Sequence, residues 1–384
     1  NINFISRNNF INPLDINNIE DRIMMDNVKE YNLWTKQKAN KYDNSLKDIW
    51  NNEIDNKEVK WGINHNKKIY ENNKVTELGL SLGEYYNSSK WEDVLEQISF
   101  EEANNFVRSG TYGNIKIGSI GKPNLTDSDG PSQIKNVLGT GFPSSSVLGQ
   151  TWSKTLSYNY GLNFGKEMNV LGVDGLYGFG ANIHRSPWGG RNYEYYSEDS
   201  LLCADLLVNL CKGLKNTGKY SYLKHLIVQE TEHERESLYT WCTEQALREI
   251  YLKPFYKAIN EGGATGVMTS YNRLGNVWTG GNTSLITGIL RNEWGYNGAI
   301  ITDYCDTDGV NYMNIEQALR AGGNLLLGNK SNLSTSLQDS NRIQNRLKEA
   351  VHQSLYMWLN ASYANSKYNS RDDIDEVINA KISS

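Results

Sequence analysis

The sequence has little of what marks several large classes of protein. It contains four cysteines among 384 residues, and none of them stands in a CxxC pair. No apolar run approaches the roughly 20 residues that a membrane helix needs. The formal net charge is −5 and the chain has no basic block, so neither a membrane nor nucleic acid is expected as a partner. The cysteines are interpreted as buried free thiols: Cys203, Cys211, Cys242 and Cys305.

Motifs for metals and cofactors are also missing. The five histidines include no HExxH pair, which argues against a metal site. Neither a GxSxG elbow nor a phosphate-binding P-loop is present, and no GxGxxG loop follows the first expected strands. We therefore expect neither a metal nor a cofactor. Asn-X-Ser/Thr sequons favour secretion slightly over a cytoplasmic location and leave both open.

Aromatic residues, in contrast, are abundant. The chain has 24 tyrosines and 10 tryptophans, whose flat faces suit stacking on sugar rings and equally suit ordinary cores. Its length fits one large α/β barrel with appendages, or two domains.

The first 88 residues are rich in Asn and Lys and show little periodicity. We interpret residues 1–88 as a partly helical linker or arm that lies on a neighbouring domain. Because the chain starts at Asn1 instead of Met, we expect a processed or excised piece. Regular structure is expected from about Ser89, where Ser99 and Glu102 form a capping box for a helix through Val107. A barrel domain is predicted over residues 89–365, with a short tail over 366–384.

Apolar runs and helical patterns alternate in the barrel region. After a loop at 122–131 and a long amphipathic stretch at 145–171, the pattern predicts alternating elements. The expected strands are 176–183, 221–228, 265–272, 298–303 and 324–328. The expected helices are 198–217, 237–261, 283–294, 314–321 and 343–359. Repeated strand–helix units of this length favour a (β/α)8 TIM-like barrel, with a doubly wound open sheet as the alternative.

Polar clusters lie at the carboxyl ends of the expected strands. They are residues 182–191, Lys224-His225, Tyr271-Asn272, and Asp303 after the run Ala299-Ile300-Ile301. Any one of them has an ordinary structural explanation, since Asp often ends a strand or caps the next helix. Together they are better explained by a site, because the carboxyl ends of parallel strands meet at one edge of the sheet.

These stretches carry a resemblance to a known family. The chain resembles the barrel domain of glycoside hydrolase family 3, the β-glucosidase and β-xylosidase family. The matching segments appear in the family's order and cover roughly residues 90–330. They read SDGP (128–131), NIHRSPWGGRNYEYYSED (182–199), KHLIVQETEHER (224–235), LREIYLKPF (247–255), MTSYN (268–272) and LRNEWGYNGAIITDY (290–304).

The resemblance implies a retaining glycosidase. Asp303 matches the nucleophile that forms a covalent glycosyl-enzyme. Tyr304 stands where the family often has Trp, so an aromatic platform is kept and its stacking is altered. If the barrel brings Arg191 and Lys224 near Asp303, we expect them to hold that carboxylate ionised. The residues implied to bind the sugar are Asp129, Arg191, Lys224, His225, Met268, Tyr271 and Tyr304.

The acid/base residue is the missing part. In most of the family it is a Glu supplied by an α/β-sandwich domain, and no such domain follows residue 330. The single-domain N-acetylglucosaminidase branch is not matched either, because the loop after Lys224-His225 reads LIVQETEHER. Glu230, Glu232 and Glu234 remain weak candidates. The segments FISRNNF and WEDVLEQISFEEA are similar to members with reversed domain order, so the sandwich is expected on a separate chain or lost in processing.

The expected function is exo-acting hydrolysis of terminal non-reducing β-D-glucosyl residues through a glycosyl-Asp303 intermediate. The expected partners are a β-glucoside or oligosaccharide substrate and a sandwich domain that completes the site. Two alternatives stay open: a sugar-binding barrel that does not turn over, and a β-xylosidase.

Overall fold

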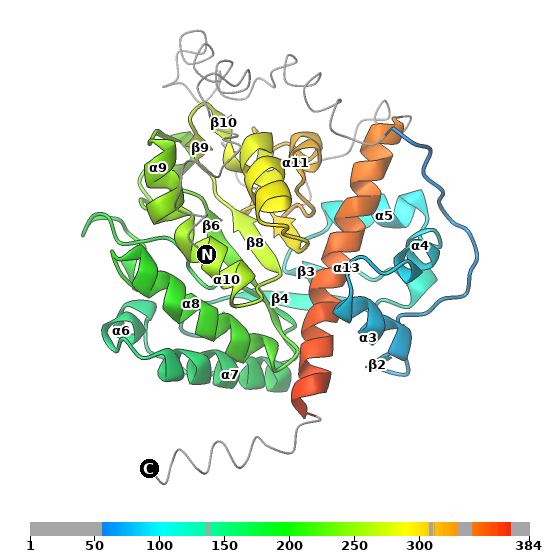
Figure 1. Ribbon diagram of the computed structural model, residues 1–384, viewed down its shortest axis with the longest axis horizontal. Helices are drawn as coiled ribbons and strands as arrows, with labels where there is room; N and C mark the ends of the chain where they lie inside the picture. The colour runs from blue at the N-terminus through cyan, green and yellow to red at the C-terminus, as the bar shows by residue number, and fades with distance from the viewer. Residues whose placement is uncertain (1–55, 136–138, 307–309, 311, 329–339, 370–384) are drawn as a thin grey trace.

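The fold is built around one curled, mostly parallel sheet (Figure 1). The computed structural model describes residues 56–135, 139–306, 310, 312–328 and 340–369. The strands of the main sheet lie in the order β11-β8-β6-β5-β4-β3, and only the β3–β4 pair is antiparallel. Their bounds are β3 (Gly113–Asn114), β4 (Leu125–Asp129), β5 (Gly175–Tyr177), β6 (Tyr220–Leu226), β8 (Gly266–Thr269) and β11 (Ala299–Ile301).

Backbone hydrogen bonds continue the sheet toward closure. Leu325 forms a parallel bridge to Ile301 of β11. The next residue, Leu326, accepts a bond from Gly110 N (3.0 Å) and donates one to Val107 O (2.9 Å). Because residues 107–110 lead directly into β3, these contacts join the two edges of the sheet. The predicted α/β, TIM-like fold is confirmed.

Helices cover the sheet on both sides (Figure 1). Helices α7, α8 and α10 pack side by side on one flank, and α13 runs along the other flank with α3, α4 and α5 beyond it. The predicted capping box is present at the start of α5, where Ser99 and Glu102 exchange hydrogen bonds. The helices are α3 (Glu77–Glu84), α4 (Lys90–Leu95), α5 (Phe100–Arg108), α6 (Ser145–Gln150), α7 (Lys154–Leu171), α8 (Ser200–Lys215), α9 (Glu244–Ala246), α10 (Lys253–Asn260), α11 (Ile315–Ala321) and α13 (Asn341–Asn369), with π-helical turns η6 (Leu247–Tyr251) and η8 (Ser284–Glu293).

The described residues before position 89, 56–88, pack on the barrel. They form a small hairpin, β1 (Tyr70–Glu71) with β2 (Lys74–Val75), followed by α3 against α13. Ile69 and Leu82 are fully buried in the same core cluster as Leu355 and Leu359 of α13. The domain limits at residues 88 and 365 stay predictions. Residues 1–55 of the expected arm and 370–384 of the expected tail lie outside the described residues.

Several local predictions were wrong. The expected loop at 122–131 contains strand β4, whose Asp127 is buried and accepts a hydrogen bond from Tyr220 Oη (2.6 Å) and one from Asn114 Nδ2 (3.2 Å). Buried polar side chains whose hydrogen bonds are made in this way can form a strand, and a search for apolar periodicity does not detect it. The amphipathic stretch 145–171 forms two helices, which are separated at residues 151–153. The strand expected at 324–328 is reduced to a single bridge between Leu325 and Ile301.

The region after residue 236 also differs from prediction. Helix begins only at Glu244, because β7 (Tyr239–Thr240) pairs with β9 (Arg273–Leu274), which pairs in turn with β10 (Val277–Trp278). The Thr243 hydroxyl accepts from Ala246 N and so fixes the start of α9. Cys242, in the turn between β7 and α9, is exposed, which corrects the expectation that all four cysteines are buried.

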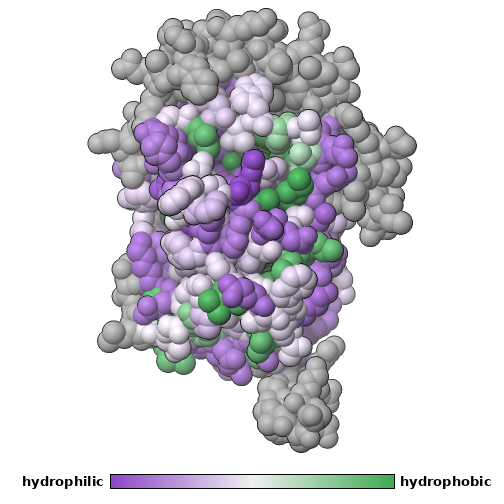
Figure 2. All heavy atoms as spheres, turned by 90° about the vertical axis from the view of Figure 1, so that its left-hand side faces the viewer, coloured by the Kyte–Doolittle hydropathy of each residue, from purple (hydrophilic) through white to green (hydrophobic). Residues whose placement is uncertain are grey.

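The surface is predominantly hydrophilic on the face that carries α6 and α9, where apolar residues form small separate spots (Figure 2). Among the described residues, none of the helices combines the length and apolar character needed to span a bilayer.

Candidate active site

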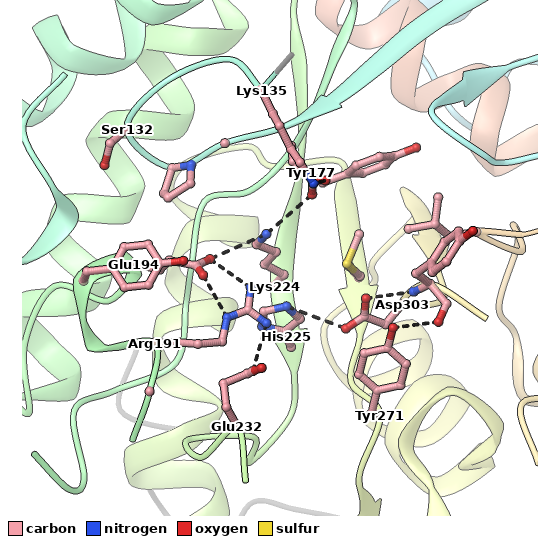
Figure 3. A pocket seen from close by; sticks show the side chains of 18 of the residues that line it. Ser132, Lys135, Tyr177, Arg191, Glu194, Lys224, His225, Glu232, Tyr271 and Asp303 are labelled. Atoms are coloured by element: carbon pink, nitrogen blue, oxygen red, sulfur yellow. Dashed lines mark hydrogen bonds and ion pairs between the residues drawn. The ribbon is translucent and has the colours of Figure 1, made fainter. Parts of the chain in front are cut away.

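A cavity of about 860 Å³ opens at the carboxyl ends of the parallel strands (Figure 3). Strand β4 ends at Asp129, β6 carries Lys224 and His225 near its end, and Asp303 comes two residues after β11. The cavity is lined by Asp303 and by all seven residues predicted to bind the sugar: Asp129, Arg191, Lys224, His225, Met268, Tyr271 and Tyr304.

One side of the cavity, here named the charge-paired wall, is a network of ion pairs (Figure 3). Its centre is a two-point contact in which Arg191 Nε and Nη2 donate to the two carboxylate oxygens of Glu194 at 2.8 and 3.0 Å. Lys224 Nζ lies 3.6 Å from Glu194 and 4.0 Å from Asp129. The members of this wall are Asp129, Lys135, Arg191, Glu194, Lys224 and Glu232.

Two glycines before Arg191 allow this network to form. Gly190 has a positive φ of 88°, and a Cβ there would lie 3.0 Å from the Cβ of Glu232. Gly189 O accepts from Glu232 N at 3.0 Å, so the two loops run against each other. Arg191 Nη1 then reaches Glu232 Oε1 at 3.2 Å.

The charges of this wall are mutually compensated. Burial acts to raise the pKa of Glu194, but Lys224 and Arg191 outweigh it, so its pKa is lowered and the side chain stays ionised. Because Glu194 is almost fully buried, its charge depends on these two cations.

The opposite side holds Asp303 and is here named the nucleophile wall, after the role predicted for this residue. Its Oδ1 accepts from the backbone N–H of Tyr304 at 2.8 Å. Its Oδ2 is buried, has no hydrogen-bond partner among the described residues and lies 3.7 Å from His225 Nε2. The wall consists of His225, Met268, Tyr271, Asp303 and Tyr304.

Burial raises the pKa of Asp303, although Tyr304 N–H, Arg191, Arg235 and Lys224 act in the opposite direction. Arg191 and Lys224 therefore act on Asp303 in the expected direction, since each lowers its pKa, but burial has the larger effect and the net pKa is raised. Both cations have carboxylate partners of their own on the charge-paired wall, and burial outweighs what reaches Asp303. Burial, together with these cations, also lowers the pKa of His225, so its imidazole is neutral.

Tyr271 is fixed on several sides. Its hydroxyl donates to Tyr304 O at 2.6 Å, and its backbone O accepts from the Tyr312 hydroxyl at 2.8 Å. Its backbone N–H donates to Gln229 Oε1 at 3.0 Å. The Arg235 guanidinium lies 4.4 Å from the centre of its ring and is also paired with Glu232, which links the two walls.

With this geometry in view, comparison with known proteins is decisive. The family model described as the glycosyl hydrolase family 3 N terminal domain matches residues 112–355. The chain belongs to glycosyl hydrolase family 3. The resemblance inferred from the sequence motifs is thereby confirmed.

Relatives in family 3 are longer than this chain. A β-glucosidase from Rhizobium radiobacter is 34% identical over 221 residues, which cover 56% of this chain and 27% of the relative. A probable β-glucosidase I from Aspergillus clavatus is 38% identical over 232 residues, covering 57% and 28%. The matched part therefore spans only about a quarter of the length of these relatives.

Solved structures of family 3 share the fold. A β-glucosidase from Paenibacillus barengoltzii matches with a TM-score of 0.68 and 28% identity, covering 86% of this chain and 38% of that one. β-Glucosidase 3B from Thermotoga neapolitana, solved with α-D-glucose, matches with a TM-score of 0.63 and 27% identity, covering 75% and 45%.

The three glutamates considered as acid/base residues of this family 3 chain lie in different places. Glu232 lines the cavity and is paired with Arg191 and with Arg235, whose Nη1 is 3.0 Å away. Glu230 is buried outside the cavity lining, where Asn182 Nδ2 donates to it at 3.2 Å. Glu234 precedes a 3₁₀ turn and accepts from the Ser237 hydroxyl at 2.9 Å.

The cavity of this family 3 barrel also contains residues that the sequence reasoning did not assign. Glu194 has a detectable signal, since it follows Arg191 by three residues in a short helical turn. Arg235 ends the matched segment KHLIVQETEHER, but only the fold of its loop brings it to the cavity. Lys135 has no sequence signal and lies 3.3 Å from Asp129, after a segment predicted as loop. Within the described residues, no group of three His, Cys, Asp or Glu is arranged to hold a metal ion.

Proposed function

We propose that this chain forms the catalytic barrel of a retaining, exo-acting β-glycosidase of the β-glucosidase kind, with Asp303 as the nucleophile. The observation that carries the proposal is the unpartnered Oδ2 of Asp303 beside a large polar cavity. An unsatisfied buried carboxylate oxygen is costly, and it is a recurrent feature of sites where a ligand supplies the missing contact.

The proposed reaction has two steps. Asp303 attacks the anomeric carbon, the bond to the leaving group breaks, and a glycosyl ester of Asp303 forms. Water then attacks the same carbon and releases Asp303. The proposal agrees with the β-glucosidase activity named for the relatives of this chain.

The charge-paired wall supplies the contacts proposed for the sugar. Its lysines and arginine offer N–H donors, and its carboxylates offer acceptors, in positions already held by ion pairs. The hydrogen bonds from such prepositioned groups to the sugar become stronger as charge develops on the ring. They therefore stabilise the transition state more than the bound substrate, which lowers the barrier. Asp129, Arg191 and Lys224 are the residues proposed to hold hydroxyls.

The proton donor is proposed to come from a separate α/β-sandwich domain. A general acid must carry a proton, whereas Asp129, Glu194 and Glu232 are each paired with at least one lysine or arginine. The barrel therefore provides the nucleophile, and a partner domain provides the second carboxyl of the retaining pair.

The test uses an activated substrate that needs little protonation, 2,4-dinitrophenyl β-D-glucoside. We expect a burst of dinitrophenolate from the wild-type chain and its loss, by at least about 10⁴-fold in rate, in Asp303→Asn. Asp127→Asn is the matched control, because Asp127 is a buried aspartate of the same barrel with hydrogen-bond partners of its own. It should keep the burst.

A fluorinated glucoside separates the alternatives. Mass spectrometry should find the 2-deoxy-2-fluoroglucosyl adduct on the peptide that contains Asp303. Glucose binding without any adduct would contradict the proposal and support a sugar-binding barrel. A faster burst with the matching β-xyloside would support a β-xylosidase. Turnover of cellobiose that appears only when a sandwich-domain chain is added would locate the acid outside this barrel.

A further inference from the structure

We propose that Glu230 is a positioning residue, which holds the Lys224-His225 segment of the cavity through the side chain of Asn182. This inference rests on the proposed function, because it assigns a role toward the same site. Glu230 lies just beyond β6, and Asn182 lies beyond the end of β5. All three partners are buried, with exposed fractions of 2% for Asn182, 1% for His225 and 8% for Glu230.

Asn182 holds the backbone of His225 at two points. His225 N–H donates to Asn182 Oδ1 at 2.6 Å, and Asn182 Nδ2 donates back to His225 O at 3.1 Å. The second hydrogen of Nδ2 goes to Glu230 Oε1 at 3.2 Å. The amide of Asn182 therefore has every hydrogen used, and Glu230 accepts the last one.

Removing the Glu230 carboxyl leaves one N–H of the Asn182 amide without an acceptor. A buried N–H left without an acceptor destabilises its local arrangement, and the side chain turns to find another partner. Asn182 can turn only by giving up its contacts with His225. Because His225 Nε2 is 3.7 Å from Asp303 Oδ2 and Lys224 faces Glu194, the movement reaches both walls of the cavity.

The position of Glu230 does not suit a proton donor. Glu230 is not among the residues that line the cavity, and its Oε1 accepts a hydrogen bond from Asn182. Burial raises the pKa of Glu230 to about 7, against Asn182 and Arg185, which lower it. The other ionisable groups near it are Tyr195, Cys242 and Tyr251. A carboxyl and an amide can both offer the single oxygen that Asn182 requires.

The experiment compares Glu230→Gln with Glu230→Ala in the full chain. The amide oxygen of Gln can accept from Asn182 Nδ2, whereas Ala has no acceptor. We expect Glu230→Ala to slow the dinitrophenolate burst about 10- to 100-fold, because small displacements of substrate-holding groups are costly, and Glu230→Gln to stay within about threefold of wild type. Glu244→Ala is the matched control: Glu244, on α9, has a largely shielded side chain (7% exposed) that is paired with Arg248, and its loss should leave the rate unchanged.

Two further readouts separate positioning from other roles. The fold-loss in Glu230→Ala should be the same for dinitrophenyl and for less activated nitrophenyl glucosides. In protein labelled with ¹⁵N-histidine, the His225 amide resonance should move in Glu230→Ala and stay close to wild type in Glu230→Gln. A loss that grows with poorer leaving groups, and is equally large in Glu230→Gln, would overturn the inference and make Glu230 the acid.

The outcomes distinguish this inference from the proposed function. If Glu230→Ala keeps both the burst rate and the His225 resonance, the inference is wrong while the proposed function stands. If the wild-type chain itself gives no burst and no adduct, the proposed function fails. The His225 resonance then still decides whether Glu230 holds the segment through Asn182.

Discussion

The two walls of the cavity handle charge in opposite ways. On the charge-paired wall, the buried carboxylate of Glu194 meets Arg191 at two points and Lys224 at 3.6 Å, and its pKa is lowered. On the nucleophile wall, the buried carboxylate of Asp303 has one oxygen without a hydrogen-bond partner among the described residues, and burial raises its pKa. The pKa values of two buried acids are therefore shifted in opposite directions, because their partners differ.

This difference indicates a division of labour. The charge-paired wall is complete without a ligand, so it can present fixed donors and acceptors at little reorganisation cost. The nucleophile wall is incomplete and is satisfied only when something binds. The following predictions break one wall at a time.

Among the substitutions that leave Asp303 in place, the largest effect is expected from Arg191→Met, which breaks the charge-paired wall. It leaves Glu194 buried with Lys224 as its remaining partner, and truncating one member of a buried ion pair typically costs about 3–5 kcal/mol of unfolding free energy. The displaced sugar-holding groups should also slow glycosylation about 100-fold. Urea unfolding and the dinitrophenolate burst measure the two quantities.

Arg248→Met is the matched control for this substitution. Arg248 is a buried arginine that makes a two-point contact with Glu293 at 2.7 and 2.9 Å, away from the cavity lining. It should lose comparable stability and keep the burst rate. Equal loss of rate in both variants would mean that the charge-paired wall matters only for folding.

A second prediction concerns pH. Asp303 must be ionised to attack, and burial raises its pKa above the ordinary value of 3.8, so glycosylation should fall as the pH drops through this raised pKa. Because Arg191 lowers the pKa of Asp303, Arg191→Met should move the acid limb to higher pH, whereas Arg248→Met should not move it. The initial burst rate, measured from pH 4 upward in stable buffers, reports the limb. An acid limb at or below pH 3.8 would contradict the raised pKa of Asp303.

The same contrast explains how far the sequence could predict the site. Asp303, Lys224-His225 and Tyr271 were predictable, because each lies at or near the carboxyl end of a buried strand and in a family motif. Strand β4 was not, since it reads Leu-Thr-Asp-Ser-Asp and depends on Tyr220, which donates to Asp127 from 93 residues away. Apolar periodicity cannot register a polar strand whose partner is so distant.

The direction of the net pKa shift of Asp303 was equally beyond the sequence. It depends on which carboxylates occupy Arg191 and Lys224, and one of them, Glu232, is 41 residues from Arg191. The motif places the cations near the nucleophile, but only the fold shows that they are already paired. Local spacing predicts proximity, whereas the distribution of charge follows from three-dimensional contacts.

The smallest effect is expected from Tyr271→Phe, which removes a neutral hydroxyl from the nucleophile wall and leaves every charged group in place. The lost hydroxyl donates to Tyr304 O at 2.6 Å, directly after Asp303 in the chain. One neutral hydrogen bond is worth about 1 kcal/mol, so we expect glycosylation to slow about fivefold, with a modest drop in melting temperature. The burst rate and a thermal melt measure these effects.

Tyr312→Phe provides the comparison that gives this small effect its meaning. The Tyr312 hydroxyl also donates to a backbone oxygen, that of Tyr271, at 2.8 Å, but Tyr312 does not line the cavity. Both variants should lose similar stability, and only Tyr271→Phe should slow the burst. If the two variants slow it equally, the Tyr271 hydroxyl acts through general rigidity, and the nucleophile wall extends beyond the residues that surround Asp303.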